Sequence, residues 1–281
     1  MMPPWVTVIC VCYNHARFVT EALDSVIIQT YPNVELIVID DGSTDGSGKV
    51  IKRWMANHPD STLIMNGKNL GYCKTFNKAY LLSKGKFIID LAADDVLMPN
   101  RIEEGVHILE RTGDDYGVTF SDAQYMDEDG NPIRLHSEKF PHETIPSGDV
   151  YKDVIQRYFI CSPTMMFRRS LLDSLKGYDE ALAFEDFDFW IRASRNFKFI
   201  YSPSVLVKKR VLSTSMSAKQ FRRSNPQRWS TLEVCKKIKE LNRTQEEVDA
   251  LKRRLFYELG VSLRSFDFTL AFSFWKLLRS I

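Results

Sequence analysis

Apolar runs and amphipathic segments alternate along the first hundred residues of the chain. Residues 5–12 read WVTVICVC, a β-branched run typical of a strand buried on both faces of a parallel sheet. From Phe18 to Ile27 apolar residues recur at three- and four-residue spacing, which predicts a helix, and Tyr31-Pro32-Asn33 ends it. The apolar run from Val34 to Ile39 then predicts a second strand. Together these segments predict a β-α-β unit.

The alternation continues beyond this unit. We expect a helix capped by Thr44 or Asp45, a strand over 61–65, a helix over 72–83, a strand over 86–91 and a helix whose first residue is Pro99. The sequence therefore predicts an α/β fold, a mostly parallel central sheet flanked by helices. Ligands of such sheets bind beyond the carboxyl ends of the strands.

Polar residues follow the predicted strands at that edge. Asn14, Asp40-Asp41 and Asp94-Asp95 each come directly after an apolar run, so their side chains are expected to converge on one crevice. Carboxylates there offer hard oxygen ligands for a divalent cation. Farther along the chain, Glu185-Asp186 begins a segment with Phe189 at helical spacing, which favours an acid anchored by an apolar helix face. These clusters suggest a site for a nucleotide, a metal and a proton acceptor.

Composition excludes several other classes of protein. The 281 residues are 44% hydrophobic and 26% charged, enough for a sizeable core, and 38 basic residues against 36 acidic ones do not suggest nucleic-acid binding. Five cysteines without a Cys-x-x-Cys pair argue against a disulfide framework and a structural zinc, and fit a reducing cytoplasm. The start, Met1 to Pro4, carries no secretory signal, and no apolar run reaches the length of a membrane span.

Short motifs in a fixed order add a family resemblance. Between about residues 5 and 215 the chain resembles family 2 glycosyltransferases, which have a GT-A (Rossmann-like) fold. The segments that carry the resemblance are Val8 to Asn14, Glu35 to Asp45, Asn69-Leu70-Gly71 with Asn77, Gly85 to Ile88, Ala93-Asp94-Asp95 with Pro99, Gly177 to Glu180, and Glu185 to Arg192. The resemblance implies transfer of a sugar from a nucleotide-diphosphate donor to an acceptor hydroxyl, with inversion at the anomeric carbon.

The resemblance also implies roles for single residues. It assigns the Mn²⁺ or Mg²⁺ ligand to Asp95, with Asp94 near the ribose or a metal-bound water, and the acceptor for uracil N3–H chiefly to Asp41, which favours a uridine donor. It assigns the general base to Asp186, assisted by Glu185. The donor-nucleotide side is completed by Asp40, Asn14, Tyr13 and Asn77.

Two departures from the family pattern keep alternatives open. Ala92 stands where many relatives have a further acid, and Leu212 where they often have a histidine; Arg210, Lys208 or Lys209 could replace that phosphate contact by charge. Each acidic pair taken alone could also be an ordinary turn or helix cap. A non-catalytic nucleotide-sugar-binding protein of the same fold is therefore an alternative. A sugar-phosphate nucleotidyltransferase is less favoured, because the loop over 13–17 has no glycine.

The C-terminal part leaves the family pattern. We expect a catalytic domain over 1–217, with the donor half at about 1–100 and the acceptor half at about 101–217, and a helical extension over 218–281 that opens with a capping box at Thr244 to Glu247. Residues 266–281 combine aromatic and basic residues, which suits a peripheral contact with the inner face of a membrane or packing in a homodimer. The sequence Gln220 to Ser224 lacks the tryptophan of a polymer synthase motif, so addition of one sugar to a glycan or lipid-linked acceptor is expected.

Overall fold

A nine-stranded sheet forms the centre of the protein in a computed structural model that describes residues 2–140, 145–213 and 225–281. The strand order is β3-β2-β1-β4-β8-β6-β9-β5, with β7 paired to β6. The strands are β1 (Val6–Cys12), β2 (Val34–Asp40), β3 (Thr62–Met65), β4 (Phe87–Ala92), β5 (Val96–Leu97), β6 (Tyr116–Met126), β7 (Pro132–Leu135), β8 (Met166–Arg168) and β9 (Lys198–Arg210).

The longer strands run in one direction. β1 is parallel to β2 and β4, β2 is parallel to β3, and β6 is parallel to β9. The short strands β5, β7 and β8 run antiparallel to their neighbours. Because β8 lies between β4 and β6 and is antiparallel to both, β4 and β6 share a direction. The predicted mostly parallel α/β sheet is confirmed, and the carboxyl ends of β1, β2, β4, β6 and β9 lie at one edge.

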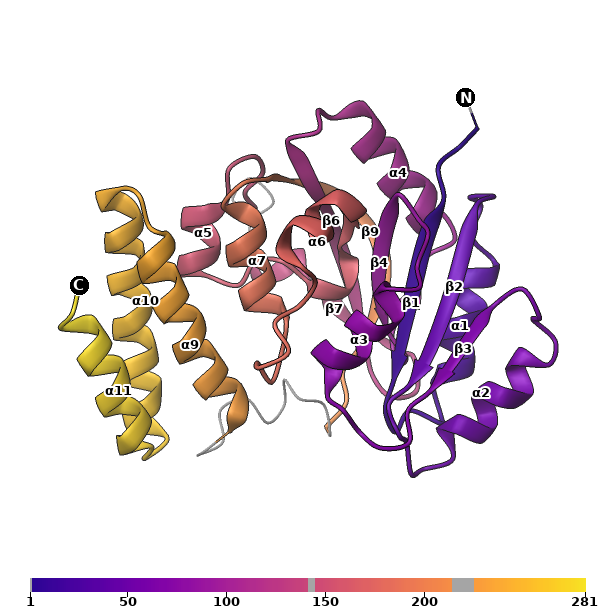
Figure 1. Ribbon diagram of the computed structural model, residues 1–281, viewed down its shortest axis with the longest axis horizontal. Helices are drawn as coiled ribbons and strands as arrows, with labels where there is room; N and C mark the ends of the chain where they lie inside the picture. The colour runs from indigo at the N-terminus through magenta and orange to yellow at the C-terminus, as the bar shows by residue number, and fades with distance from the viewer. Residues whose placement is uncertain (1, 141–144, 214–224) are drawn as a thin grey trace.

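Helices cover both faces of this sheet (Figure 1). Alternate residues of β1 point to opposite faces of the sheet. Val6, Val8 and Cys10 pack in one apolar cluster, whereas Ile9 and Val11 pack in another. The helices that flank the sheet are α1 (Val19–Ile27), α2 (Ser47–Met55), α3 (Tyr72–Tyr80), α4 (Arg101–Arg111), α5 (Tyr151–Gln156), α6 (Arg169–Leu175) and α7 (Asp186–Ser194), with short 3-10 turns η1 (Ser137–Lys139) and η3 (Ser162–Thr164). This burial on both faces accounts for the continuous apolar runs in the sequence.

From residue 225 onward the described part of the chain forms α9 (Pro226–Leu241), α10 (Gln245–Arg264) and α11 (Phe268–Leu278). Figure 1 shows them as a bundle at the end of the molecule opposite β3 and α2, beside α5 and α7. Leu232 and Ile238 of α9 and Leu251 of α10 belong to the same apolar cluster as the core beneath α7. The predicted capping box at Thr244 and Glu247 is present. None of the helices in the described ranges combines the length and apolarity required to cross a bilayer.

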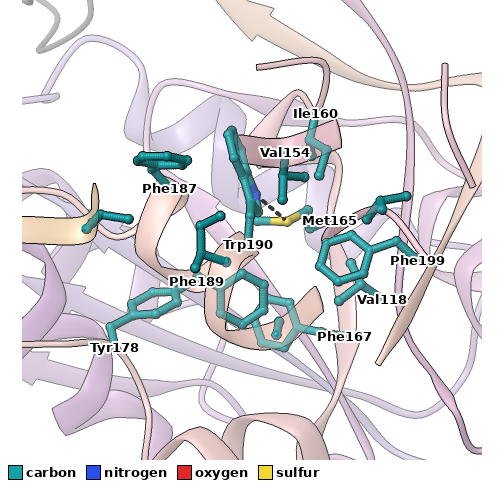
Figure 2. Packing of buried hydrophobic residues seen from close by; sticks show 14 of the residues in the cluster. Val118, Val154, Ile160, Met165, Phe167, Tyr178, Phe187, Phe189, Trp190 and Phe199 are labelled. Carbon is teal, nitrogen blue, oxygen red and sulfur yellow. Dashed lines mark hydrogen bonds between the residues drawn. The ribbon is translucent and has the colours of Figure 1, made fainter. Parts of the chain in front are cut away.

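The core beneath α7 is rich in aromatic residues. Figure 2 shows Phe187, Phe189 and Trp190 of this helix packed among buried side chains of the sheet and of α5. The Trp190 indole N–H donates to the sulfur of Met165 at 3.3 Å. Aromatic packing of this kind immobilises the helix. The start of α7, which carries the predicted base, is therefore held on a rigid support.

Some predicted boundaries differ from the structure. The helix expected to start at Pro99 begins at Arg101, because the Pro99 carbonyl instead accepts a hydrogen bond from the Thr30 N–H. The third helix ends at Tyr80 rather than Ser83. The Gln220 to Ser224 motif and most of the serine-rich stretch after Leu212 lie outside the described residues.

Candidate active site

Backbone and side-chain hydrogen bonds join the loops that follow β1 and β2. The Asn14 N–H donates to Ser43 Oγ at 2.9 Å, and Asn14 Oδ1 accepts from the Thr44 N–H at 2.8 Å. The His15 N–H donates to Ser47 Oγ at 2.9 Å. Asn14 has a φ of 58°, a left-handed conformation that asparagine tolerates better than most residues. The side chain of Asn14 thus joins the loop after β1 to the loop after β2.

The two acids at the end of β2 have different environments. Asp41 accepts from the Asn66 amide at 2.9 Å and from backbone N–H groups of residues 70 and 71 at 2.8 and 3.1 Å, so it fastens the loop after β3. Asp40 accepts only the Ser43 N–H, through Oδ2, at 3.2 Å. Its Oδ1 is buried and has no hydrogen-bond partner among the described residues. Asp40 therefore keeps a free acceptor, whereas Asp41 is largely occupied.

The acids after β4 also differ. Asp95 is 3% exposed, and its Oδ1 accepts from the Arg210 N–H at 2.9 Å. Burial and the neighbouring Asp94 raise the pKa of Asp95 to about 8, against the opposing effect of Lys209 and Arg210. The Asp94 side chain is 13% exposed and lies 3.6 Å from Nδ1 of His15 on the β1 loop. Asp94 is thus the more exposed acid at this strand end, beside the loop that follows β1.

The basic residues at the end of β9, Arg210 and Lys209, differ in their roles. The Arg210 guanidinium donates to the backbone carbonyls of Asp94, Asp127 and Glu128 at 3.1 Å each, which joins the ends of β4, β6 and β9. Arg210 is buried, so the expectation that it could contact a phosphate is not supported by its position. Burial alone would lower the pKa of Lys209, but nearby acidic groups, including Asp95 and Asp186, raise it above its ordinary value. Lys209 is therefore a half-buried cation whose charged form is stabilised by acids of both clusters.

A cluster of acids surrounds the start of α7. Glu185 is the N-cap residue of the helix and Asp186 its first residue. Glu185 Oε2 and Asp186 Oδ1 are buried atoms that have no hydrogen-bond partner in the described ranges. Beneath them, Asp90 of β4 accepts from the hydroxyls of Tyr72 at 2.6 Å and Tyr178 at 2.8 Å. Asp186 Oδ1 is thus a buried acceptor to which none of the described residues donates a hydrogen bond.

Electrostatic repulsion couples these acids. Burial and the proximity of Asp186 raise the pKa of Asp90 to about 7, although the two tyrosine hydroxyls oppose that shift. Burial, Asp186 and Asp90 raise the pKa of Glu185 well above its ordinary value. Acids whose pKa is perturbed by both burial and a like charge are typical of functional sites.

Buried ion pairs anchor α7 to the C-terminal helices. Asp188 is buried and accepts from Lys237 of α9 at 2.5 Å and from Arg192 at 2.6 Å. Lys237 also donates to Asp179, on the loop before α7, at 2.5 Å. Loss of one partner of a fully buried ion pair costs on the order of 3–5 kcal/mol, and a pair with a partly exposed partner such as Lys237 costs less. These pairs make the helical extension part of the support for Asp186.

Asn77 and Tyr13 differ in whether their side chains are free to contact a donor nucleotide. The Asn77 amide donates to the Tyr178 carbonyl at 2.9 Å and accepts from the Tyr178 N–H at 2.9 Å, so it holds the loop before α7. Because those groups are occupied by the chain itself, we expect no direct donor contact from Asn77. Tyr13 is 44% exposed at the end of β1 and is free to contact a base.

The structure adds residues that the sequence did not reveal. Asp90, Tyr72 and Tyr178 form the hydrogen-bonded base of the acidic cluster. The available signal was an acid inside the buried apolar run over 86–91, where a carboxylate is costly unless it is partnered. No group of three or more His, Cys, Asp or Glu side chains in the described part of the chain forms a ready metal site. A cation held by one or two carboxylates together with substrate phosphates does not require such a group.

The raised pKa of Asp90 predicts a pH dependence of stability. Asp90 titrates near pH 7 when folded and near 3.8 when unfolded, so the native state binds more protons between these values. The contribution of Asp90 to the free energy of unfolding should fall as pH rises from about 4 to about 7 and then level off. We expect Asp90→Asn to reduce this fall by about 1–3 kcal/mol. Urea denaturation at pH 5 and pH 8 measures the difference, with the exposed Asp129→Asn as control. Equal pH slopes in wild type and Asp90→Asn would contradict the assignment.

Comparisons with known proteins agree with this architecture. The chain is 29% identical over 214 residues to an uncharacterized glycosyltransferase of Methanocaldococcus jannaschii, which covers 75% of this chain and 72% of the relative. A relative from Rickettsia felis is longer, and the match covers 36% of it.

Two solved glycosyltransferases share the fold. One is the mannosyltransferase PcManGT from Pyrobaculum calidifontis in complex with GDP-Man and Mn²⁺, with a TM-score of 0.71, 18% identity, and coverage of 100% of this chain and 75% of that one. The other is S. aureus TarS 1–349 in complex with UDP-GlcNAc, with a TM-score of 0.68, 19% identity, and coverage of 92% and 73%. Residues 7–176 match the family described as glycosyl transferase family 2. The chain therefore belongs to glycosyl transferase family 2 and is a glycosyltransferase with a GT-A fold.

Proposed function

We propose that this glycosyltransferase moves one sugar from a nucleotide-diphosphate donor, a UDP-sugar in the first instance, to an acceptor hydroxyl with inversion. The observation that carries the proposal is the buried Asp186 Oδ1, which has no partner in the described residues and lies at the start of a rigid helix. A base with a free oxygen at a fixed position is what deprotonation of an acceptor hydroxyl requires.

For the nucleotide, Asp40 is the better candidate than Asp41. Its Oδ1 is buried and unpartnered in the described ranges, so a base N–H could replace the missing hydrogen bond. Asp41 then acts indirectly by fastening the loop after β3. Tyr13, exposed at the adjacent strand end, offers a ring face to the base. A guanine base also carries an N–H donor, so Asp40 alone does not select uridine.

For the metal, we propose Asp94 rather than Asp95 as the protein ligand. The Asp94 carboxylate is the more exposed of the two and lies beside the loop after β1, while Asp95 is buried against Arg210. A hard cation such as Mn²⁺ or Mg²⁺ suits carboxylate and phosphate oxygens. When bound, the cation would neutralise charge that develops on the leaving diphosphate.

The residues of the chain then have distinct roles in an inverting displacement. Asp186 accepts the proton of the acceptor hydroxyl as its oxygen forms a bond to the anomeric carbon. The bond from that carbon to the diphosphate oxygen breaks on the opposite face, and the nucleoside diphosphate leaves. Lys209, whose charged form Asp95 and Asp186 stabilise, would add positive charge to the site as the diphosphate leaves. Glu185 and Asp90 assist by setting the charge around the base.

Ala92 supports a second candidate function. An acid is missing at a strand end where many family members carry one, which fits a protein that binds a nucleotide sugar without transferring it. Asp90 lies two residues earlier on the same face of β4, but its oxygens are used by Tyr72 and Tyr178. Turnover distinguishes the two functions, because a binding protein retains donor affinity without product.

The experiment is a transfer assay with UDP-sugars and GDP-mannose, with and without Mn²⁺. Release of nucleoside diphosphate that depends on an acceptor extract would support the proposal, and NMR of the product would give its anomeric configuration. A product that retains the donor configuration would contradict the role of Asp186. Donor binding without release of nucleotide from any donor would favour the non-catalytic alternative.

The acceptor is proposed to be a growing glycan or a lipid-linked oligosaccharide at the cytoplasmic face of a membrane. Support comes from exposed aromatic residues on α10, α11 and the turn between them: Phe256, Tyr257, Phe266, Phe268, Phe272 and Trp275. An exposed apolar face of this kind marks a contact with a membrane or with another protein, here a second copy of the chain.

A vesicle assay tests the membrane contact. The chain should sediment with phosphatidylglycerol vesicles, and the double variant Phe272→Ser and Trp275→Ser should lose that binding by about tenfold or more, because two large apolar side chains no longer enter the lipid. Light scattering without lipid separates the alternative. A dimer that the double variant dissociates, with no vesicle binding, would contradict the membrane contact and support self-association.

A further inference from the structure

A cavity of about 300 Å³ lies outside the strand-end crevice, where the segment after α5 meets α9 and α10. Figure 1 shows α10 running beside α5 at this end of the molecule. Among its lining residues are three arginines and one glutamate, namely Arg157, Arg228, Arg254 and Glu258. Arginine side chains thus reach the cavity from α9, from α10 and from the segment after α5.

Arg254 is the central side chain of this cavity. It is 3% exposed, and its guanidinium carbon lies 4.1 Å from the ring centre of Tyr158 and 4.6 Å from that of Phe187. Its Nε lies 3.0 Å from the Glu258 carboxylate, but its Nη2 is buried without a hydrogen-bond partner in the described part of the chain. Stacking on two rings fixes the plane of the guanidinium and leaves its edge free to bind.

Two neighbouring side chains, Tyr158 and Arg228, also bear on what the cavity could bind. The Tyr158 hydroxyl is buried and also has no hydrogen-bond partner within the described ranges. Arg228 is buried and donates to the hydroxyls of Ser262, at 2.7 Å, and Ser265, at 2.5 Å, so its hydrogen bonds go to neutral groups. Two buried donors without a hydrogen-bond partner in the described residues, Arg254 Nη2 and the Tyr158 hydroxyl, are costly unless a ligand completes them.

The chemistry of these donors identifies the ligand class. A planar guanidinium with a free edge matches the paired oxygens of a carboxylate or phosphate. The free guanidinium edge of Arg254 and the Tyr158 hydroxyl both offer donors, so they favour an oxyanion and disfavour a cation or an apolar ligand.

The cavity is linked through Phe187 to the helix that carries the proposed base. Phe187 directly follows Asp186, and its ring contacts both Arg254 and Tyr158, the latter edge to face at 5.2 Å. A group bound there would therefore lie on the side of α7 that faces the helical extension, apart from the donor crevice at the strand ends. We propose that this cavity binds a carboxylate or phosphate group of the acceptor, an inference that rests on the transferase function proposed above.

Direct anion binding tests the cavity without using activity. Inorganic phosphate and methyl glucuronate are titrated into the full chain and followed by calorimetry and thermal unfolding. Arg254→Gln should weaken binding by about tenfold or more, because a charged hydrogen bond is lost, and Tyr158→Phe should weaken it by several-fold. Arg253→Gln is the matched control, since it removes the same charge from an exposed neighbour on α10. Absence of saturable binding, or equal affinity in Arg254→Gln and Arg253→Gln, would overturn the site.

Kinetics then identify the source of the anion. With an anionic acceptor, Arg254→Gln should raise KM for the acceptor by about tenfold and leave UDP affinity unchanged. If phosphate binds at Arg254 but the acceptor KM does not change, the site serves a free anion and the acceptor assignment is wrong. Failure of wild type to bind any nucleoside diphosphate would instead count against the proposed function and leave the anion-binding result standing on its own.

Discussion

Asp186→Asn should lower kcat for sugar transfer by about 10² to 10⁴-fold, the range expected when a general base is removed. Asparagine has nearly the same shape, so the packing of α7 on its aromatic core should remain. The amide cannot accept the proton of the acceptor hydroxyl, whereas the donor crevice at the strand ends is unchanged. Nucleoside diphosphate affinity should therefore match that of wild type, measured by calorimetry beside the transfer rate.

Two other acids near α7 provide controls for this variant. Glu180→Gln changes an exposed carboxylate on the preceding loop and should retain transfer. Asp188→Asn should lower the free energy of unfolding, because it breaks the buried pairs with Lys237 and Arg192. A transfer rate for Asp186→Asn within a few fold of wild type, in a folded protein, would remove Asp186 from the role of base.

Asp94→Ala should abolish the dependence of transfer on Mn²⁺ and lower kcat/KM by about a hundredfold or more, since metal stabilisation of a leaving diphosphate contributes several kcal/mol. The variant removes the more exposed carboxylate at this strand end and leaves the buried Asp95 with its Arg210 contact. The measurement is the initial rate over a range of Mn²⁺ concentrations.

Asp129→Asn is the matched control for Asp94→Ala. This acid is exposed on the loop after β6, paired with Arg17, and its loss should leave the metal response unchanged. The complementary variant, Asp95→Asn, should retain a metal response even if its stability changes. A metal response that persists in Asp94→Ala and disappears in Asp95→Asn would restore the ligand assignment that the family resemblance favoured.

The fold was predictable because its signals are local. The apolar run over 5–12 and the helical spacing after Phe18 each reflect burial of one segment, and both elements are present as β1 and α1. The convergence of the acidic pairs followed from the rule that parallel strands end at one edge. The helix predicted to begin at Pro99 begins two residues later, because the fixed φ of proline suits both a first helical turn and the extended segment before it.

The assignment within each acidic pair was not predictable. Adjacent residues point to different sides of a strand end, and which one faces the crevice depends on partners distant in sequence. Asp41 is occupied by the loop over 66–71 and Asp95 by Arg210 of β9, neither of which a local motif reveals. The cavity around Arg254 was hidden for the same reason, since α9, α10 and the segment after α5 are separated by long stretches of sequence.

The most direct test of the account is calorimetric titration of the wild-type chain with UDP, GDP and the other nucleoside diphosphates, with and without Mn²⁺. We expect saturable binding of at least one diphosphate, UDP first among them, and tighter binding when Mn²⁺ is present. No binding of any nucleoside diphosphate, with or without the metal, would contradict the proposal that the strand-end crevice holds a nucleotide-sugar donor.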